Sequence, residues 1–557
     1  MSSTFFGFNI ARSGIFASQR ALNITSHNIS NANTEGYSRQ RLEVKQSTPM
    51  LLPSGQGMIG TGVETENIIQ IRNEFLDYKY RGENMSYGEW NAKFKNLDNI
   101  QAVFNEPSKS GIQTVLSQFF SSISELSKKP GNLTNRALVR QRAIALTTNI
   151  NHMASKFEKL QTDTDFEICT TVDEINGYSE QIRKLNESIH KSELDGSKAN
   201  DLRDQRNLLV DKLSELVNVD CYEDNQNRFN VLVNGKPLVS HFRCNKLEYN
   251  VRATKLNPGV DAENLHDIKW DDGSSFSPRT GKIKALLDIR DNVSGDNKGI
   301  PFYMKKLNEF ADGFAEEMNR IHKSGYDLDK NTGINFFTIN GMSSTEYETH
   351  LINNGLNKGA AVEVTSSVTS GLSGLTGEEK KKKIRQNIEN VLKSDPTYEG
   401  KTVKLLSGGK YYVVDKISAK DLTISKDIQD SDKGLNKIAA SSEGDPNLPG
   451  NGLNAIAMVD IRHDTELFGT GSPEDFVTSL ISNLGVDAQA AERMKDNQIV
   501  LIKQVENSRQ SVSGVSLDEE MTNMIKFQHS FNANSRMITA MDEMIDTIVN
   551  RMGTVGR

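Results

Sequence analysis

Long heptad repeats of apolar residues at both ends constrain the fold of this 557-residue chain more than any other feature of its sequence. Near the amino terminus the repeated positions are Phe8, Ile15, Leu22 and Ile29. Near the carboxyl terminus they are Leu517, Met524, Phe531, Ile538, Ile545 and Met552. This spacing predicts two coiled-coil-like helices of about 40 to 60 Å. The apolar stripe of each helix is too narrow for the helix to be stable alone in water. We predict that these ten residues form an assembly interface.

Two arrangements of the terminal helices are compatible with the pattern. They can pair with each other as an inner domain of one subunit, or pack against neighbouring subunits. Ile10, Ala17 and Ile24 form a second apolar stripe about 160° from the first, which requires a second partner. Gly14 costs about 1 kcal/mol relative to alanine within a helix and weakens a simple two-helix pair. We therefore expect a paired terminal domain that is poorly ordered in the monomer and becomes ordered on assembly.

A polar segment follows the first helix and predicts a sharp turn. The sequence "ITSHNISNANTEGYSRQR", residues 24–41, brings asparagine, threonine and glycine where another core segment would be expected. Side chains of Asn31 and Asn33 can bond to the backbone, and Gly36 can adopt a positive φ. We predict a connector turn at Asn31, Asn33, Gly36 and Tyr37.

Further repeats between the ends predict an elongated helical rod. One seam runs from Val139 to Leu160 and, after a polar break, continues from Ile168 to Ile189. It predicts one helix or a pair of helices up to about 75 Å long. Residues 220–290 instead alternate in polarity around an Asn234-Gly235 pair, which predicts a β-hairpin, and Asp272-Gly273 marks a second turn.

These patterns predict a mainly α protein with β insertions, arranged as an elongated multidomain rod. The expected terminal assembly domain combines 1–65 with 508–557. The expected helical rod domain combines 66–218, 283–340 and 462–507. The expected β domain combines 219–282 with parts of 430–461. Residues 341–430, with mixed α and β signals, form an expected inserted outer domain.

Composition excludes several classes of function. With 36% hydrophobic and 25% charged residues and a net charge of -7, the chain suits folded, elongated domains rather than disorder. A pI near 5.9 and the lack of a dominant basic stripe argue against nucleic acid as a partner. No apolar run approaches the roughly 18 residues of a membrane span, and the start lacks the features of a signal peptide. We expect no membrane partner and no conventional export signal.

The sequence contains no motif that indicates catalysis or a resident metal. Cys169, Cys221 and Cys244 lack C-x-x-C spacing and are interpreted as buried thiols. The segment "DLDKNTGINFFT", residues 327–338, begins like a calcium loop, but threonine replaces the required glycine and glutamate, so an Asx-rich turn is favoured. The nine histidines, among them His322, have contexts typical of solvated side chains. We predict no enzyme activity, no catalytic residues, no cofactor and no metal.

Four segments together resemble a known family. They are "ALNITSHNISNANTEGYSRQR" (21–41), "NRIHKSGYDLDKNTGINFFT" (319–338), "NKIAASSEGDPNLPGNGLNAIAMVDI" (436–461) and "SVSGVSLDEEMTNMIKFQHSFNANSRMITAMDEMIDTIVN" (511–550). The chain resembles the axial proteins of the bacterial flagellum. Its "GYSRQ" form, residues 36–40, is similar to that of the hook-associated proteins at the junction between hook and filament.

The resemblance implies a structural subunit of the hook–filament junction that polymerises through its N- and C-terminal helices. The alternative is another axial protein, such as a hook or distal rod subunit. The implied partners are further copies in a ring, the hook protein, a second junction protein (hook-associated protein 3), an export chaperone and the type III export apparatus. The implied location is the extracellular flagellum, reached by secretion. Because the four segments flank 341–430, deletion of 345–430 is expected to be tolerated for export and junction formation.

Overall fold

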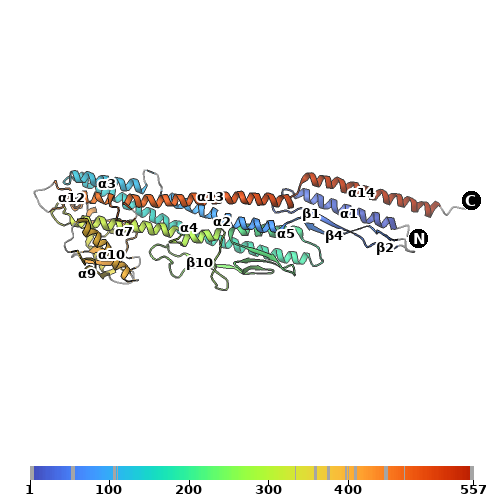
Figure 1. The fold of residues 1–557 in the computed structure, drawn as a ribbon, viewed down its shortest axis with the longest axis horizontal. Coiled ribbons are helices and arrows are strands. Elements are labelled where there is room, and N and C mark those ends of the chain that lie inside the picture. The colour runs from blue at the N-terminus through green and yellow to red at the C-terminus, as the bar shows by residue number, and fades with distance from the viewer. Residues whose placement is uncertain are drawn as a thin grey trace, which may run out of the picture.

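The fold is elongated and mainly helical, and both termini lie at the same end (Figure 1). The structure is a computed structural model that describes residues 6–551 except 52–56, 105–107, 109–110, 296, 333, 355, 357–360, 373–376, 396–397, 399–400, 407–409, 444–449 and 470. The predicted fold class, an elongated multidomain protein with small β sheets, is confirmed. No helix among these described residues is long and apolar enough to cross a membrane.

The terminal domain contains a pair of antiparallel helices. The helices are α1 (Phe6–Ser30) and α14 (Leu517–Asp546), and α14 continues into a π-helical turn, η5 (Thr547–Arg551). Strands β1 (Gln40–Gln46) and β4 (Val63–Gln70) pair antiparallel beside α1, and β2 (Met50–Leu51) pairs with β3 (Met58–Ile59). The predicted pairing of the two ends is therefore confirmed.

Long helices build the rod. They are α2 (Glu74–Phe104), α3 (Ile112–Lys128), α4 (Leu133–Ser192), α7 (Ile300–Ser324) and α13 (Pro473–Ser513). The 60-residue α4 is a single helix about 90 Å long, so the polar break in its repeat does not divide it. Helix α13 runs antiparallel to α2, since Arg509 lies over Tyr80 while Lys495 lies over Phe94.

Side-chain caps define where the longest helices begin. The side chain of Asn132 accepts hydrogen bonds from the backbone of Thr134 and Asn135 at the start of α4. Ser472 and Asp475 form a reciprocal capping box at the start of α13. Each cap satisfies backbone N–H groups that have no partner within the helix.

Two hydrophobic cores lie along α4. The first joins its N-terminal half to α2, α3, α7 and α13, and the second joins its C-terminal half to α5 (Asn200–Leu216), α6 (Lys282–Asp291) and the β segment. Between the cores, Gln161, Thr164 and Asp165 are buried polar residues of the same helix. The polar break in the sequence is therefore a buried hydrogen-bonded layer within α4.

The β segment forms one sheet of four strands and one of two. Its strands are β5 (Asp220–Glu223), β6 (Phe229–Val233), β7 (Lys236–Ser240), β8 (Arg243–Cys244), β9 (Leu247–Val251) and β10 (His266–Trp270). Asn234 and Gly235 have φ of 52° and 81°, as the primed turn of a tight hairpin requires. The hairpin predicted at this pair is confirmed, and Gly273, with φ of 81°, lies in the predicted second turn.

The segment 341–430 packs against the rod and also has a small core of its own, formed by Val368, Val391, Val403 and Val413. Strand β11 (Phe337–Ile339) pairs with β15 (Leu422–Ile424), and a three-stranded sheet lies between them in the chain. The other elements are α8 (Ser344–Asn354), β12 (Val362–Glu363), α9 (Thr365–Val368), α10 (Gly377–Ser394), β13 (Lys401–Leu406), β14 (Lys410–Asp415) and α11 (Lys426–Gln429). Tyr347, Leu406 and Ile428 are buried in the first core. Because deletion of 345–430 would open that core, we expect the deletion to destabilise the rod; its effect on export and junction formation stays a prediction.

The described residues of 430–461 lie on the first core, whereas the sequence groups part of this range with the β segment. Helix α12 (Leu453–Asp460), followed by the 3₁₀ turn η4 (Ile461–His463), packs against α3 and α7. The buried guanidinium of Arg136 on α4 donates to the backbone carbonyls of Leu435 at 3.1 Å and Ile438 at 2.7 Å. These bonds hold this segment on the first core, so its predicted grouping differs from its packing.

His322 departs from the solvated state expected of it, because its side chain is fully buried in α7. Its Nε2 accepts the backbone N–H of Ala439 at 2.9 Å, so Nδ1 carries the proton and donates to the carbonyl of Ile334 at 2.5 Å. Burial lowers the pKa of His322 to about 4. Nearby, Asp327 accepts the backbone N–H groups of Asp329 and Asn331, which confirms the predicted Asx-rich turn.

Candidate assembly surface and connector turn

Small residues bring α1 and α14 unusually close together. A Cβ on Gly14 would lie 2.6 Å from Nδ2 of Asn534, so a larger residue at this crossing would require the Asn534 side chain to move. One turn on, Ser18 donates to Ser530 at 3.1 Å or to the carbonyl of Gly14 at 2.8 Å. Gly14 therefore permits close packing of α1 on α14, although the sequence alone suggests that this glycine weakens the helix pair.

The second stripe of α1 faces the β1–β4 hairpin within the same chain. Ile24 is buried, and Ser13 accepts the backbone N–H of Val63 at 3.2 Å. Gly62, with φ of 119°, approaches so closely that a Cβ would clash with the hydroxyl of Ser13. The second stripe thus has a partner within the same chain, although Ile10 remains 36% exposed. That the ends become ordered only on assembly stays a prediction.

The predicted interface residues lie along the seam between α1 and α14. Eight of them, at positions 8, 15, 22, 29, 524, 531, 538 and 545, are half-buried. Leu517 is exposed, and Met552 lies outside the described residues. The seam is therefore first a contact within one chain, and its role between subunits remains a prediction.

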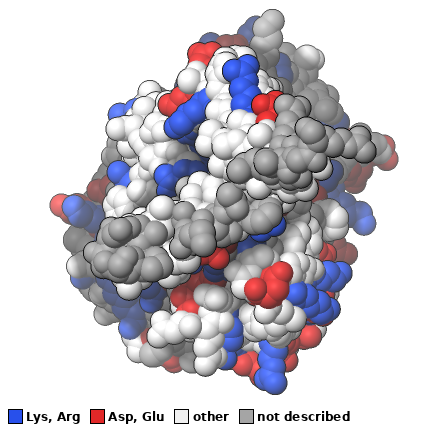
Figure 2. Space-filling model, turned by 90° about the vertical axis from the view of Figure 1, so that its right-hand side faces the viewer, with Lys and Arg blue, Asp and Glu red and all other residues white. Residues whose placement is uncertain are grey.

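Other apolar side chains of this domain remain exposed. Phe16, Met521, Ile525, Met537 and Met544 are each more than half exposed. Sequence reasoning missed them because they lie outside the heptad positions. Figure 2 shows this end of the molecule, where basic and acidic side chains are interspersed around uncharged surface rather than gathered into a patch of one sign.

The predicted connector turn is a hydrogen-bonded structure at the end of α1. Gly36 has φ of 78°, so the predicted positive φ is confirmed. Asn31 accepts the backbone N–H of Thr34 at 2.9 Å through its carbonyl, and its side chain donates to the carbonyl of His27 at 3.1 Å. Asn33 is exposed, whereas Tyr37 is half-buried and reaches back to α1.

Asn28 is the central residue of this turn, and its amide makes four hydrogen bonds. Its Oδ1 accepts from the backbone N–H of Gln40 at 3.0 Å and from the hydroxyl of Tyr37 at 2.8 Å. Its Nδ2 donates to the carbonyl of Gln40 at 2.9 Å and to Oε2 of Glu520 at 3.1 Å. Burial and, next, the charge of Asp201 raise the pKa of Tyr37, so its hydroxyl stays protonated and can donate. Asn28 therefore joins α1, β1 and α14.

Ionic contacts anchor the turn to the rod and to the C-terminal helix. The backbone N–H and hydroxyl of Ser38 both donate to Asp204 of α5, at 2.9 and 2.8 Å, and Arg72 bonds the same carboxylate at 3.1 Å. Arg39 bonds Glu520, a buried residue of α14, at 2.7 Å. Sequence reasoning missed these partners because the residues that meet here come from four separate parts of the chain.

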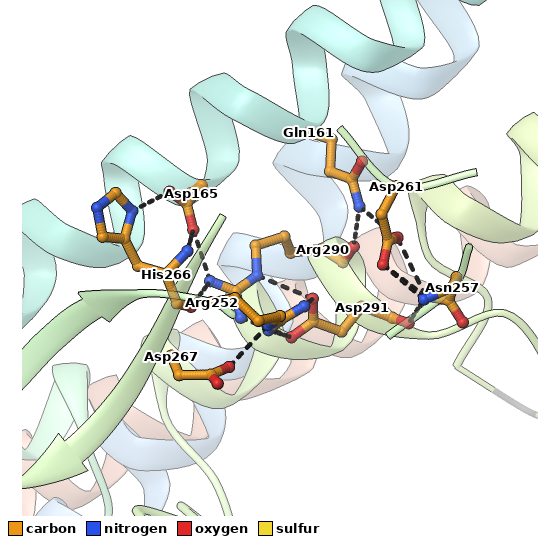
Figure 3. Close-up of polar contacts among 9 residues, drawn as sticks. All are labelled: Gln161, Asp165, Arg252, Asn257, Asp261, His266, Asp267, Arg290 and Asp291. Carbon is orange, nitrogen blue, oxygen red and sulfur yellow. Dashed lines mark hydrogen bonds and ion pairs between the residues drawn. The ribbon is translucent and has the colours of Figure 1, made fainter. Parts of the chain in front are cut away.

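The buried polar layer of α4 contains the cluster in the described chain that comes closest to a metal site. Ligand atoms of Asp165, Cys169 and His266 lie within 4.8 Å of one another. However, Asp165 already accepts from Arg290 and from His266, each at 2.6 Å (Figure 3). Burial raises the pKa of Cys169 to about 11, so the thiol is protonated. The cationic guanidinium and the protonated thiol favour an ion-pair network over a metal site.

The same network links the two cores. Arg290 of α6 also bonds Asp291, and Arg252 bonds both Asp267 of β10 and Asp291 (Figure 3). Gln161 of α4 donates to Asp261 at 3.0 Å on the other side of Arg290. This layer therefore ties α4 to α6 and to the β segment.

Comparison with known proteins identifies the class of protein to which the chain belongs. The family model for the "Flagellar hook-associated protein FlgK helical domain" matches residues 97–337. The models "Flagella basal body rod protein" and "Flagellar basal body rod FlgEFG protein C-terminal" match 8–37 and 507–552, which cover α1 and α14. A rod carried by such paired terminal helices is the fold of a flagellar axial structural protein.

The relatives define the family within that class. The chain is 30% identical to flagellar hook-associated protein 1 of Bacillus subtilis strain 168 over the whole of both chains. It is 26% identical to the protein of that name from Escherichia coli K12, over 97% of this chain and 99% of the other. The chain belongs to the flagellar hook-associated protein 1 (FlgK) family.

A solved structure shares the fold. The flagellar hook junction protein FlgK from Burkholderia pseudomallei aligns with 78% of this chain and 100% of its own, with a TM-score of 0.55 and 14% identity. At this identity the likeness concerns the fold alone.

Proposed function

We propose that the protein is a structural subunit of the junction between hook and filament, and that it polymerises through α1 and α14. The observation that carries the proposal is the terminal pair. It is held together by small residues at its centre, while large apolar side chains such as Phe16, Ile525 and Met544 remain exposed. Full burial of each such side chain contributes about 1.5–3 kcal/mol, so a contact between subunits along this surface is strongly favoured.

The connector turn determines how the rod is oriented relative to the terminal pair. Asn28 and Ser38 bind the end of α1 to β1 and α5, so an assembled inner layer of α1 and α14 would orient the rod outward in a defined direction. In this proposal the inner helices surround the export channel. Half-buried seam residues such as Phe531 and Ile538 contribute to contacts along that layer.

The proposed partners follow from this position. They are further copies of the chain in a ring, the hook protein on one side and the second junction protein, hook-associated protein 3, on the other. A flagellar export chaperone and the type III export apparatus deliver the subunit to the extracellular flagellum. Neither nucleic acid nor membrane is part of this proposal.

A different axial role is the alternative, since the rod-protein models match both terminal helices. Immunogold electron microscopy with antibodies against the purified chain separates the two roles. We expect gold particles at the boundary between hook and filament, and none on flagella from a strain that lacks the gene. Label along the hook or at the rod would support the alternative and overturn the junction role.

A further inference from the structure

A buried lysine and a buried aspartate meet where the segment 341–430 joins the rod. Lys404 of β13 and Asp312 of α7 are 1% and 4% exposed, and their Nζ and Oδ1 atoms lie 2.7 Å apart. The two residues are 92 positions apart in the sequence. The hydroxyl of Tyr347 lies 3.4 Å from the same Nζ, and Oε2 of Glu316 lies 3.9 Å from it.

A buried ion pair of this kind gives a fold little net stability. Removing both charges from water costs several kcal/mol per ion, and apolar residues of similar size often stabilise a core at least as well. The site instead places an amine beside a carboxyl group, with a second carboxyl group from the next turn of the same helix. That combination provides a nucleophile, an acyl group and a proton carrier.

We propose that Lys404 and Asp312 condense to an intramolecular isopeptide bond that joins β13 covalently to α7. The amine nitrogen attacks Cγ of Asp312, the new C–N bond forms, and one carboxyl oxygen leaves as water. The ammonium begins with three hydrogens: one remains on the amide nitrogen and two leave with the oxygen. The condensation therefore needs no oxidant, reductant or added co-reactant.

Proton transfer within the cluster makes the two groups reactive. The attacking amine must be neutral and the carboxyl group protonated, and one proton moved along the 2.7 Å hydrogen bond produces both. Burial alone would lower the pKa of Lys404, whereas the charge of Asp312 raises it, so the ion pair is the resting form. The dry surroundings reduce the free-energy difference between the charged pair and the neutral pair, because burial disfavours charged groups.

Glu316 is placed to carry the second proton. It follows Asp312 by one helical turn, so both side chains lie on the same face of α7. Its side chain is 27% exposed, and burial raises its pKa to about 7, so it can both accept and return a proton near neutral pH. Glu316 takes a proton from the attacking nitrogen and returns it to the oxygen that leaves as water.

The surrounding backbone holds Asp312 in position. The backbone N–H of Ile417 donates to the same Oδ1 at 2.9 Å, so the carboxyl group is fixed from two sides. Since the reacting residues are distant in sequence, the bond can form only after α7 and β13 have packed together. The bond would close the chain between 312 and 404 and attach the segment 341–430 permanently to the rod.

Mass spectrometry of the full-length, folded protein under denaturing conditions tests the proposal. We expect an intact mass lower than that of the sequence by one molecule of water, and a branched proteolytic peptide that joins Asp312 to Lys404. Asp312→Ala and Glu316→Gln should each have the full mass of their own sequences, with no loss of water. Because Glu316 is partly exposed, Glu316→Gln should retain the helical circular-dichroism spectrum of the wild type.

A matched control comes from the same strand. Lys401 pairs with Asp415 at a partly exposed site, so Lys401→Arg should retain the loss of one water. A folded wild-type protein with the full mass would overturn the proposal. A loss of water that maps to any other pair of residues would also overturn it. Loss of water in folded Glu316→Gln would overturn the proton-carrying step assigned to Glu316.

Discussion

The substitution Gly36→Val tests whether the connector turn is a fixed part of the folded subunit. Gly36 has φ of 78°, which a β-branched residue adopts only at a cost of about 1–3 kcal/mol. A Cβ there would also lie 3.1 Å from Cβ of Leu208 on α5, and crowding of this kind adds about 1 kcal/mol. The turn should therefore lose about 2–4 kcal/mol, which corresponds to roughly 30- to 900-fold more frequent local opening.

Hydrogen exchange of the purified protein measures this opening directly. The backbone N–H groups of residues 37–40 all have acceptors that depend on the turn, so their exchange should accelerate by that factor. Exchange in the first half of α4 should not change. Ser30→Ala is the control, since exposed Ser30 bonds only its own helix at Ser26.

Two results would refute this reasoning. Unchanged exchange at 37–40 in Gly36→Val would show that the turn imposes no positive φ. Unprotected exchange at these positions in the wild type would show that the turn packs on α5 only after assembly, as the sequence alone suggests.

Substitutions in the seam, in the rod and at the buried histidine test further parts of the structure. Phe531→Asp should leave the rod folded but abolish incorporation into flagella, because a charge in the half-buried seam costs several kcal/mol. The control Gln528→Asp, at an exposed position, should incorporate normally. Electron microscopy of complemented strains checks both variants. Gly88→Ala should destabilise the rod by about 2–4 kcal/mol in urea unfolding, since its Cβ would lie 2.0 Å from the carbonyl oxygen of Glu215. The control Gly177→Ala, with open space around it, should stabilise the rod by about 0.5–1 kcal/mol. Equal effects of the two substitutions would contradict the packing of α2 on α5. Folding lowers the pKa of His322 from 6.5 to about 4, so as the pH falls the unfolded chain takes up the proton before the folded chain does. The free energy of unfolding should therefore decline by up to about 3 kcal/mol between pH 6.5 and pH 4. Urea midpoints that decline equally in His322→Gln would contradict this assignment.

The heptad repeats predicted the terminal helices well because a seven-residue spacing corresponds directly to one helix face. The same pattern carries no information on the distance to the partner backbone, so Gly14 suggested weakness where the structure shows close packing. The connector turn was predictable at Gly36 because a positive φ has a strong residue preference. Asn28 was not recognised, since its partner Glu520 lies 492 positions away in the chain.

The interior of the rod was harder to predict. A change in composition predicted an inserted outer domain at 341–430. The segment has a small core of its own, but Tyr347 and Leu406 also complete the first core from its two halves. Burial of His322 likewise depends on backbone groups of Ile334 and Ala439, which meet it only in the folded chain. Contacts of this kind have no local sequence signal.

The most direct test of the proposed junction role is electron microscopy of flagella from a strain that lacks the gene for this chain. For the proposed role we expect complete hooks without attached filaments, and recovery of filaments when the wild-type gene is restored. Filaments of normal length attached to hooks in the deletion strain would contradict it.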